Sequence, residues 1–356
     1  MELHEVAAET QDQGHEGGSR TGKYTILETL NWGSSGVVNL VCLSRNLKQK
    51  FACKNLRLEE GRSAKILKEV DLIRKASHKH VVRIVDAFAD ARGRFQIVMA
   101  PAADCDLSGY LRDQIPEARL AGWDSFGRQR VILFQWMYCL ITAVEHMHGS
   151  DIRHRDLKPD NILVYNDRIL ITDFGISFHS NQGTEYTNTP TLGTPKYLPP
   201  EADDKRRCGK AGDIFSLGCV FWEMADALSD PILSTNSKFP REIKRYSDLV
   251  RNYENGDDNF LSKVTQIQEH KRMKKRLPEH CRLRNSFGTL LLLIYNMMNP
   301  SPDERPTAKQ LNMRFDGVIR EAECPALPCC FHLGHLSENQ ALDDILNDFD
   351  SNRQDP

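Results

Sequence analysis

The sequence has no long apolar run and no excess of charge of either sign. No stretch of 18 apolar residues occurs in its 356 residues, and the polar, acidic N-terminus lacks the apolar core of a signal peptide. The 47 basic and 49 acidic residues give a formal net charge of -2, so no global field attracts nucleic acid or an anionic membrane. We therefore expect a soluble intracellular protein with neither as a partner, cytoplasmic or nuclear.

The ten cysteines follow no repeating spacing. They stand in apolar or mixed contexts, as reduced thiols do, and this argues against a disulfide framework. The segment ECPALPCCFHLGHL, residues 323–336, contains enough cysteine and histidine to bind zinc, but its spacing matches no common zinc motif. A tail with free thiols is the favoured interpretation.

Three segments of the chain differ in pattern. Residues 1–22 are rich in Gly, Glu and Gln and are predicted to be disordered. Residues 23–318 carry periodic apolar patterns and are predicted to form one domain with two lobes, 23–100 and 101–318. Residues 319–356 are predicted to be a largely disordered tail, in which only the stretch LDDILNDF has the apolar spacing of a short helix.

The first lobe is predicted to be mostly β. Between Tyr24 and Phe51, short alternating runs are separated by turn-prone segments, which is typical of an antiparallel meander. The stretch SAKILKEVDLIRKA then places Ile66, Val70 and Ile73 at helical spacing amid charges, and VVRIVDAFA and RFQIVMA read as two further strands. The expected fold class is α+β, with a small antiparallel lobe that carries one main helix.

The second lobe is predicted to be larger and mostly helical. Residues 127–149 repeat apolar side chains at spacings of three and four, which predicts a buried helix. Two short strands, ILV and ILITD, follow it, and the runs DIFSLGCVFWEMA and FGTLLLLIYNMM predict further helices. The apolar stripe of the first helix consists of Val131, Phe134, Met137, Leu140, Val144 and Met147.

The stretch IRHRDLKPDNILVYNDRILITDFG, residues 152–175, is the richest in chemically active side chains. An HRD is followed by a lysine two residues after its aspartate, by an asparagine five after it, and by a DFG twelve residues further on. This set resembles the signature of the eukaryotic protein kinase family, serine/threonine type. The resemblance covers residues 23–318 and implies the two-lobed protein kinase fold.

The resemblance implies transfer of a phosphoryl group from ATP with Mg²⁺ as cofactor. Such transfer needs a carboxylate that accepts the proton of the attacking hydroxyl, and cations that offset the phosphate charge. By resemblance Asp156 is that carboxylate and Lys158 contacts the γ-phosphate. Asn161 and Asp173 offer the hard oxygen ligands that Mg²⁺ prefers. Each residue alone reads more simply as an exposed loop residue, but four at the family's spacing rarely occur by chance.

The first lobe supplies the other half of the expected ATP site. FACK resembles the family strand whose lysine contacts the α- and β-phosphates, which makes Lys54 that lysine. Glu69 is its expected ion-pair partner, because it lies nine residues before HKHVV, a segment that resembles the family's HPNIV. Without the HRD and DFG motifs, a solvated lysine and a solvated helix glutamate would be the favoured interpretation.

The segment NWGSSGVV resembles the glycine-rich phosphate loop of the family with one departure. Gly33 and Gly36 occupy the second and third glycine positions, where backbone amides approach phosphate, and Val38 follows. Asn31 stands at the first glycine position, and asparagine tolerates positive φ better than most residues. The change could weaken nucleotide affinity or stiffen the loop, but it removes no catalytic group.

The resemblance also implies an adenine pocket of small and branched apolar side chains between the lobes, made of Val38, Ala52, Met99 and Leu163. The Ala100 carbonyl and the Ala102 amide would bind the adenine edge. Further positions match residues that support the family's site, namely Ile73, Ile84, His154 and Phe174 as a stacked spine, Asp213 as a buried brace, and Glu201 with Arg305 as an ion pair.

Two motifs bear on substrate and regulation. Lys158 in HRDLKPDN and Thr194 in GTPKYLPPE resemble the serine/threonine branch and imply protein substrates. Arg155 suggests activation by phosphorylation of the segment SNQGTEYTNTPTLGT by an upstream kinase, with Thr189 and Thr191 as the favoured acceptors. The alternative is a polar loop that is never modified. The basic run HKRMKKR is either a nuclear import or docking signal or, more simply, a solvated face.

Two rival functions stay open at this point. A pseudokinase, which keeps the fold and acts as a nucleotide-binding or scaffolding module, is favoured by Asn31, Ala100 and the proline Pro199 in PPE. A kinase-like enzyme for small molecules is disfavoured by GTPKYLPPE, which resembles the family's peptide site. The sequence says nothing of substrate identity, pathway or oligomeric state.

Overall fold

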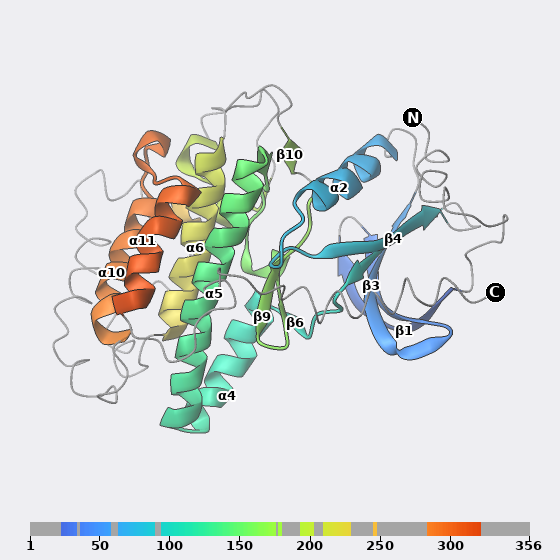
Figure 1. Ribbon diagram of the computed structural model, residues 1–356, viewed down its shortest axis with the longest axis horizontal. Helices are drawn as coiled ribbons and strands as arrows, with labels where there is room; N and C mark the ends of the chain where they lie inside the picture. Colours follow the sequence, from blue (N-terminus) through green and yellow to red (C-terminus); the bar gives the residue numbers. More distant parts are fainter. Residues whose placement is uncertain are drawn as a thin grey trace.

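The computed structural model of the protein places a β-rich lobe beside a helical lobe (Figure 1). The strands of the first lobe lie on the right of that view and the long helices of the second on the left, so the predicted two-lobed α+β fold is confirmed. The residues that the structure describes are 23–33, 36–57, 63–89, 94–175, 177–179, 193–202, 209–228, 245–247 and 283–321.

The first lobe is built on a five-stranded sheet. Its strand order is β1-β2-β3-β5-β4, and every pair of neighbours is antiparallel. Short turns between alternating apolar runs favour this meander, and the predicted strands are confirmed. Their bounds are β1 Tyr24–Gly33, β2 Gly36–Leu43, β3 Asn46–Arg57, β4 Arg83–Ala89 and β5 Arg94–Ala100.

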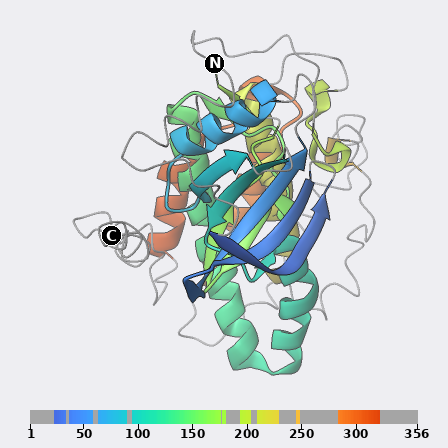
Figure 2. The ribbon, with the colours of Figure 1, turned by 90° about the vertical axis from the view of Figure 1, so that its right-hand side faces the viewer.

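One helix, α2 (Ser63–Lys75), packs against this sheet, as the spacing of its apolar residues predicted. Figure 2 shows it crossing above the strands. Ile66, Val70 and Ile73 are all buried, whereas Lys75 pairs with Asp71 on the exposed face at 2.9 Å. The apolar stripe thus determines which face of α2 packs against the sheet. This orientation also sets where the charged side chains of the helix point.

The second lobe is organised around two long helices, α5 and α6, which contact each other. The stripe predicted for α5 is buried from Phe134 to Met147, and Val131 at its start is half-buried. The helices of this lobe are α3 Leu107–Gly109, α4 Ile115–Leu120, α5 Trp123–Gly149, α6 Lys210–Leu228, α10 Leu283–Met297 and α11 Ala308–Glu321, with a π-helical turn at Tyr110–Gln114.

Helix α6 is the central helix of this lobe. Its residues 212–222 are buried without interruption, which agrees with a helix that is apolar all round. Gly218 lets α10 approach closely, because a Cβ there would lie 2.8 Å from the Met298 Cγ and 3.0 Å from the Met297 Cβ. A polar or charged side chain within residues 212–222 of α6 therefore has mainly protein groups to pair with.

Short strands hold the functional loops at the junction of the lobes. Strand β7 pairs with β10, and β8 lies between β6 and β9. A parallel bridge between Val81 and Ile171, with a 3.0 Å bond from the Val82 N–H to the Ile171 carbonyl, ties the first lobe to this region. The bounds are β6 Cys105–Asp106, β7 Ile152–Arg153, β8 Ile162–Tyr165, β9 Arg168–Ile171 and β10 Phe178–His179.

Several predictions from sequence lie outside the described residues. These are the disorder of residues 1–22, the acceptors Thr189 and Thr191, the basic run at 270–276, the Cys/His segment and LDDILNDF. Helix α11 runs to Glu321 and so includes the first three residues of the predicted tail, 319–321. The proposed domain boundaries otherwise stay predictions.

Candidate active site

A charged cluster joins the two lobes. Lys54 on β3 lies 2.7 Å from the Glu69 Oε1 on α2 and 3.2 Å from the Asp173 Oδ1, which follows β9. Lys54 and Glu69 are buried, whereas the Asp173 side chain is 42% exposed. The sequence predicted the Lys54–Glu69 pair, and the structure forms it.

The pKa shifts of Lys54 and Asp173 both favour the charged form of the side chain. Burial by itself would lower the pKa of Lys54, but the negative charges of Glu69 and Asp173 outweigh it and raise that pKa. Burial would likewise raise the pKa of Asp173, but Lys54 outweighs it, so the pKa of this carboxyl is lowered. Near neutral pH the Lys54 ammonium and the Asp173 carboxylate are therefore both charged where the two lobes meet.

A second polar cluster surrounds Asp156. Its Oδ2 accepts a 3.0 Å hydrogen bond from the Asn161 side-chain amide and lies 3.1 Å from the Lys158 Nζ. Its Oδ1 accepts from both the N–H and the hydroxyl of Thr194, each at 2.8 Å. Lys158 in turn donates to the Thr194 hydroxyl at 2.7 Å. Through these bonds Asp156, Lys158 and Asn161 of HRDLKPDN and Thr194 of GTPKYLPPE form one cluster.

The backbone beneath Asp156 is held in a strained shape by Asp213. The buried Asp213 carboxylate accepts the His154 N–H at 2.9 Å and the Arg155 N–H at 2.7 Å, and it lies 3.0 Å from the His148 Nε2. Arg155 has φ 72° and Asp173 has φ 62°, conformations that cost non-glycine residues about 1–3 kcal/mol each. Asp213 matches the predicted brace, whereas the part played by His148 was not foreseen.

The predicted spine residues connect the same region to the core. The rings of His154 and Phe174 meet edge to face with centroids 5.0 Å apart, and a ring nitrogen of His154 lies 2.9 Å from the Thr172 carbonyl. Ile73 is buried, and Ile84 packs on the same core cluster. Core packing explains these contacts fully, so a regulatory role for the four residues stays a prediction.

The predicted adenine-pocket residues come from both lobes. Val38 faces Lys54 across the β2–β3 pairing, and Ala52 faces Met99 across β3–β5. Leu163 on β8 pairs with Asp106, so it reaches the junction from the helical side. Ala100 ends β5 and is buried, and Ala102 is half-buried in the linker that follows. Binding of adenine by these groups stays a prediction.

The glycine-rich segment is shaped differently from our expectation. Asn31 lies inside β1 opposite Val38 and is not in the left-handed region, so its tolerance of positive φ is not used. Gly36 has φ +152°, and a Cβ there would lie 2.2 Å from the Asn55 carbonyl oxygen of β3. The sheet itself therefore requires this glycine, independently of any phosphate. Gly33, the last residue of β1, pairs with Gly36, the first residue of β2.

The paired Glu201 and Arg305 form a buried brace in the helical lobe. Each Glu201 oxygen accepts a 2.7 Å bond from the Arg305 guanidinium, and the same group donates to the carbonyls of Ala211, Asn299 and Pro300. The ion pair that the sequence matched to the family is therefore present. Glu201 is the glutamate of the PPE segment, so this ion pair anchors the end of GTPKYLPPE to the helical lobe.

A cluster that the sequence reasoning missed lies beside Thr194. Glu223 on α6 accepts hydrogen bonds from the hydroxyls of Tyr197 and Tyr246, both at 2.9 Å, and lies 2.7 Å from the Lys196 Nζ. One sequence signal could have pointed to it, because Glu223 is the only charged residue between Ile214 and Ala225 of a buried, otherwise apolar helix.

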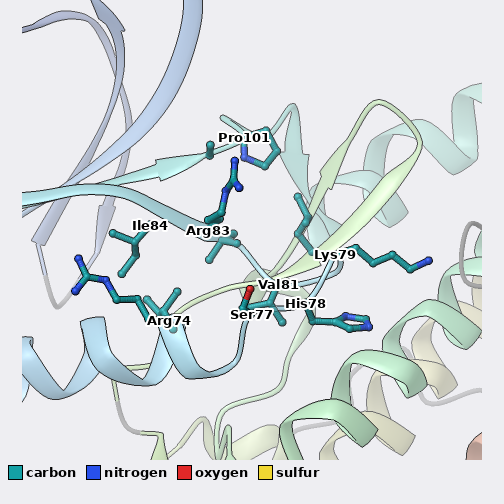
Figure 3. A pocket seen from close by; sticks show the side chains of 12 residues that line it. Arg74, Ser77, His78, Lys79, Val81, Arg83, Ile84 and Pro101 are labelled. Atoms are coloured by element: carbon teal, nitrogen blue, oxygen red, sulfur yellow. The ribbon is translucent and has the colours of Figure 1, made fainter. Parts of the chain in front are cut away.

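A separate cavity of about 360 Å³ lies behind the linker (Figure 3). The end of α2, the loop before β4, the first part of β4 and the linker residues Ala100 and Pro101 line it. Its charged lining residues are basic, and Figure 3 shows the Arg74 and Lys79 side chains extending in different directions. None of the residues predicted to be catalytic lines this cavity.

In the part of the chain that the structure describes, no group of three or more His, Cys, Asp or Glu side chains is arranged to hold a metal ion. Over the same residues, no helix has both the length and the apolar character needed to span a bilayer.

Comparison with known proteins agrees with this geometry. The family described as Protein kinase domain matches residues 24–314. Serine/threonine-protein kinase Nek3 of Mus musculus is 27% identical over 327 residues, which cover 90% of this chain and 54% of Nek3. Serine/threonine-protein kinase crk1 of Schizosaccharomyces pombe is 26% identical over 302 residues, which cover 82% of this chain and 84% of crk1. The nekl-2 kinase of Caenorhabditis elegans is 33% identical over 210 residues, 56% of this chain and 57% of nekl-2.

A β lobe on a helical lobe, with a lysine–carboxylate cluster facing an HRD loop, defines the protein kinase class. The chain belongs to the eukaryotic protein kinase family, serine/threonine type. It spans little more than half the length of some of these relatives, Nek3 and nekl-2 among them.

Proposed function

We propose that the protein is an active serine/threonine protein kinase that transfers the γ-phosphoryl group of ATP to protein hydroxyls. The observation that carries the proposal is that both charged clusters are complete. Lys54, Glu69 and Asp173 lie in contact between the lobes, and Asp156 is bonded to Asn161 within the loop below. A chain that only kept the fold would have no need to keep every one of these charges.

The proposed reaction assigns a task to each group. The substrate hydroxyl attacks the γ-phosphorus, the bond from that phosphorus to the β–γ bridging oxygen breaks, and ADP leaves. Asp156 orients the hydroxyl and accepts its proton, while Lys158 and Lys54 offset negative charge on the phosphates. Asn161 directs its amide N–H group at the Oδ2 of Asp156 and so holds the carboxylate in one orientation.

The residues present fit a bound Mg²⁺. The Asn161 side-chain nitrogen is used in bonding to Asp156, so its oxygen is the atom it can offer to a cation. The Thr172 N–H donates to the Asn161 carbonyl at 3.0 Å, which brings the neighbouring Asp173 close. Two protein oxygens suit Mg²⁺, which usually keeps phosphate and water as its other ligands and supplies charge stabilisation when bound.

A pseudokinase is the main alternative, because three motif positions depart from the family pattern. Of these, Asn31 pairs with Val38 across β1–β2, directly after a register shift between Thr29 and Asn31, and it removes no charged group of either cluster. Pro199 precedes the Glu201–Arg305 brace without preventing it. Ala100 has no physical explanation here. A small-molecule kinase is less favoured, since Thr194 of the predicted peptide site bonds to Asp156.

Regulation and location belong to the same proposal. Arg155 precedes Asp156, and its backbone N–H is bonded to Asp213. We propose that its guanidinium binds a phosphate that an upstream kinase adds to Thr189 or Thr191, two residues that lie outside the described part of the chain. We propose protein substrates, a cytoplasmic location and, if the basic run acts as an import signal, a nuclear one.

The test is phosphate transfer by the purified protein with Mg-ATP and a generic protein substrate, followed by intact-mass measurement and site mapping. Asp156→Asn is the matched control, because asparagine keeps the size of the side chain and removes the base. We expect phosphate on the substrate, or on Thr189 or Thr191, only with the wild type. Nucleotide binding without transfer by either protein would favour the pseudokinase.

A further inference from the structure

The Lys196 ammonium group lies in a cage made by a carboxylate and two aromatic rings. Its Nζ is 2.7 Å from the Glu223 Oε1, and it lies 5.2 Å and 5.6 Å from the ring centroids of Tyr197 and Tyr246. Both tyrosine hydroxyls also donate to the same Glu223 oxygen. Carboxylates and aromatic faces within this range both attract cations, so the cage is a site for a positive charge.

The cage is close to the proposed reaction centre. Lys196 is two residues after Thr194, whose hydroxyl bonds to Asp156 at 2.8 Å. Since successive Cα atoms are about 3.8 Å apart, the two Cα atoms are within about 8 Å. An extended substrate advances about 3.3 Å per residue. A side chain within about three residues of the acceptor hydroxyl can therefore reach the cage.

The cage also opens to the surface, unlike the fully buried ion pair of this lobe. The Lys196 and Glu223 side chains are 36% and 23% exposed, whereas those of Arg305 and Glu201 are 0% and 5% exposed. A substrate side chain can thus approach Glu223 from solvent. The obstacle it meets is the ammonium group of the chain's own lysine.

We propose that the cage is a substrate subsite that Lys196 itself fills. This inference rests on the proposed function, because a peptide must cross Asp156 for the subsite to matter. With Lys196 present, the Glu223 charge is compensated and a second cation is repelled, so the enzyme does not select arginine or lysine at the corresponding substrate position. Without Lys196, Glu223 and the two rings accept the guanidinium of a substrate arginine.

The proposal can be tested without turnover. Serine-centred peptide pools, with either arginine or its neutral analogue citrulline fixed at each of the three positions on either side of the serine, are titrated against the protein by fluorescence anisotropy. For Lys196→Ala we expect arginine to bind about tenfold more tightly than citrulline at one position, as one partly desolvated charge pair would give. The wild type should not discriminate. Equal discrimination by both proteins, or none by either, overturns the proposal.

Two further variants show which groups are responsible. Lys196→Met keeps an apolar stem over the two rings and removes the charge, so it should gain arginine selection as the alanine variant does, even if alanine disturbs the loop. Adding Glu223→Gln to Lys196→Ala keeps an oxygen for the tyrosine hydroxyls but removes the negative charge. It should abolish the gain, and a gain that persists would assign selection to another group.

The same pools with Mg-ATP separate this inference from the proposed function. Phosphorylation by wild type and variant with identical preferences would leave the kinase function standing and remove the subsite. Arginine-selective binding by the variant, with no phosphorylation by either protein, would support the subsite and argue against the kinase function. Lys75→Ala, in an exposed pair on α2, is the matched control and should leave every preference unchanged.

Discussion

Two buried ion pairs of this kinase, Arg305–Glu201 and Lys54–Glu69, resemble each other in chemistry and differ in what surrounds them. Arg305 bonds to both Glu201 oxygens and to three backbone carbonyls, and neither side chain is exposed by more than 5%. Lys54 bonds to Glu69 and to an Asp173 side chain that is 42% exposed.

This difference suits a structural role for the Arg305–Glu201 pair and the proposed phosphate-binding role for Lys54. Every direction around the Arg305 guanidinium is met by a protein group, so the pair holds loop and helix together and has no contact left to exchange. Among the described residues, Lys54 bonds to two carboxylates, which come from different lobes, and the side chain of the second, Asp173, is 42% exposed. Under the proposed function, a phosphate group of ATP would replace part of that contact, because it offers the same sign of charge to the ammonium.

The largest effect on stability is expected from Arg305→Met. The substitution leaves Glu201 buried without its cation, and breaking a buried pair in this way costs about 3–5 kcal/mol. Urea unfolding followed by circular dichroism measures it as a lower midpoint with an unchanged slope. A loss below about 1 kcal/mol, as exposed pairs show, would remove the distinction between the two pairs.

Lys54→Met should lower the phosphorylation rate strongly and the stability less than Arg305→Met does. Removing one charge aimed at the transferring phosphates should lower the phosphorylation rate about 10²–10³-fold. We expect a smaller stability loss than for Arg305→Met, because Lys54 bonds to two protein oxygens and Arg305 to five, and because water can reach Asp173, one of the two carboxylates that remain. Both quantities are measured on the same preparation, by phosphate incorporation and urea unfolding. Equal destabilisation by the two methionine variants would argue against a functional specialisation of Lys54.

A third buried carboxylate, Asp213, extends the comparison, because its contribution to the free energy of unfolding depends on pH. Burial would raise the pKa of Asp213, but hydrogen bonding and the charge of His148 outweigh it and lower that pKa. The ionised group therefore stabilises the fold above its unfolded-state pKa of about 3.9, and this contribution is lost as the pH falls toward the folded-state pKa.

The pH argument predicts how wild type and Asp213→Asn differ. The difference in their free energies of unfolding should be constant above about pH 5.5 and should shrink by up to about 1.4 kcal/mol per pH unit on acidification. Urea titrations at several pH values give both curves. A difference independent of pH down to about pH 3 would mean that the Asp213 charge contributes nothing.

The smallest effect is expected from Lys75→Ala, which removes an exposed helix pair with Asp71. Pairs spaced four residues apart on a helix contribute about 0.3–0.5 kcal/mol, and salt screens them further. Thermal unfolding at low and high salt should show a small difference that disappears at high salt. A cost comparable to that of Arg305→Met would show that burial is not what separates these pairs.

Much of the fold could be predicted, because local pattern decides it. Alternation and short turns predicted the five strands, and the spacing of Ile66, Val70 and Ile73 predicted the buried face of α2. The prediction for α5 was slightly too broad, since Val131 at the start of the stripe is only half-buried. A periodic pattern indicates which face is apolar, but not how far a neighbouring element covers it.

The candidate site was predicted by motif resemblance, and its supporting contacts were not. Asp156 and Lys54 could be found because their neighbours in sequence belong to recognisable motifs. His148 and Tyr246 have no such neighbours, and each reaches its carboxylate partner from an element distant in sequence. The reason for Gly36 was also beyond sequence reasoning, because the obstructing Asn55 carbonyl belongs to another strand.

The sequence by itself determined the element order, the apolar faces and the identity of the charged groups, because these follow from periodicity and from short motifs. Only the tertiary structure decided which charges meet. Lys54 and Asp173 are 119 residues apart and bond at 3.2 Å, and Lys196 and Glu223 come from a short 3-10 turn and from the central helix α6. The packing of whole elements sets such distances, and the burial that follows decides whether a charge pair braces the fold or stays open to a ligand.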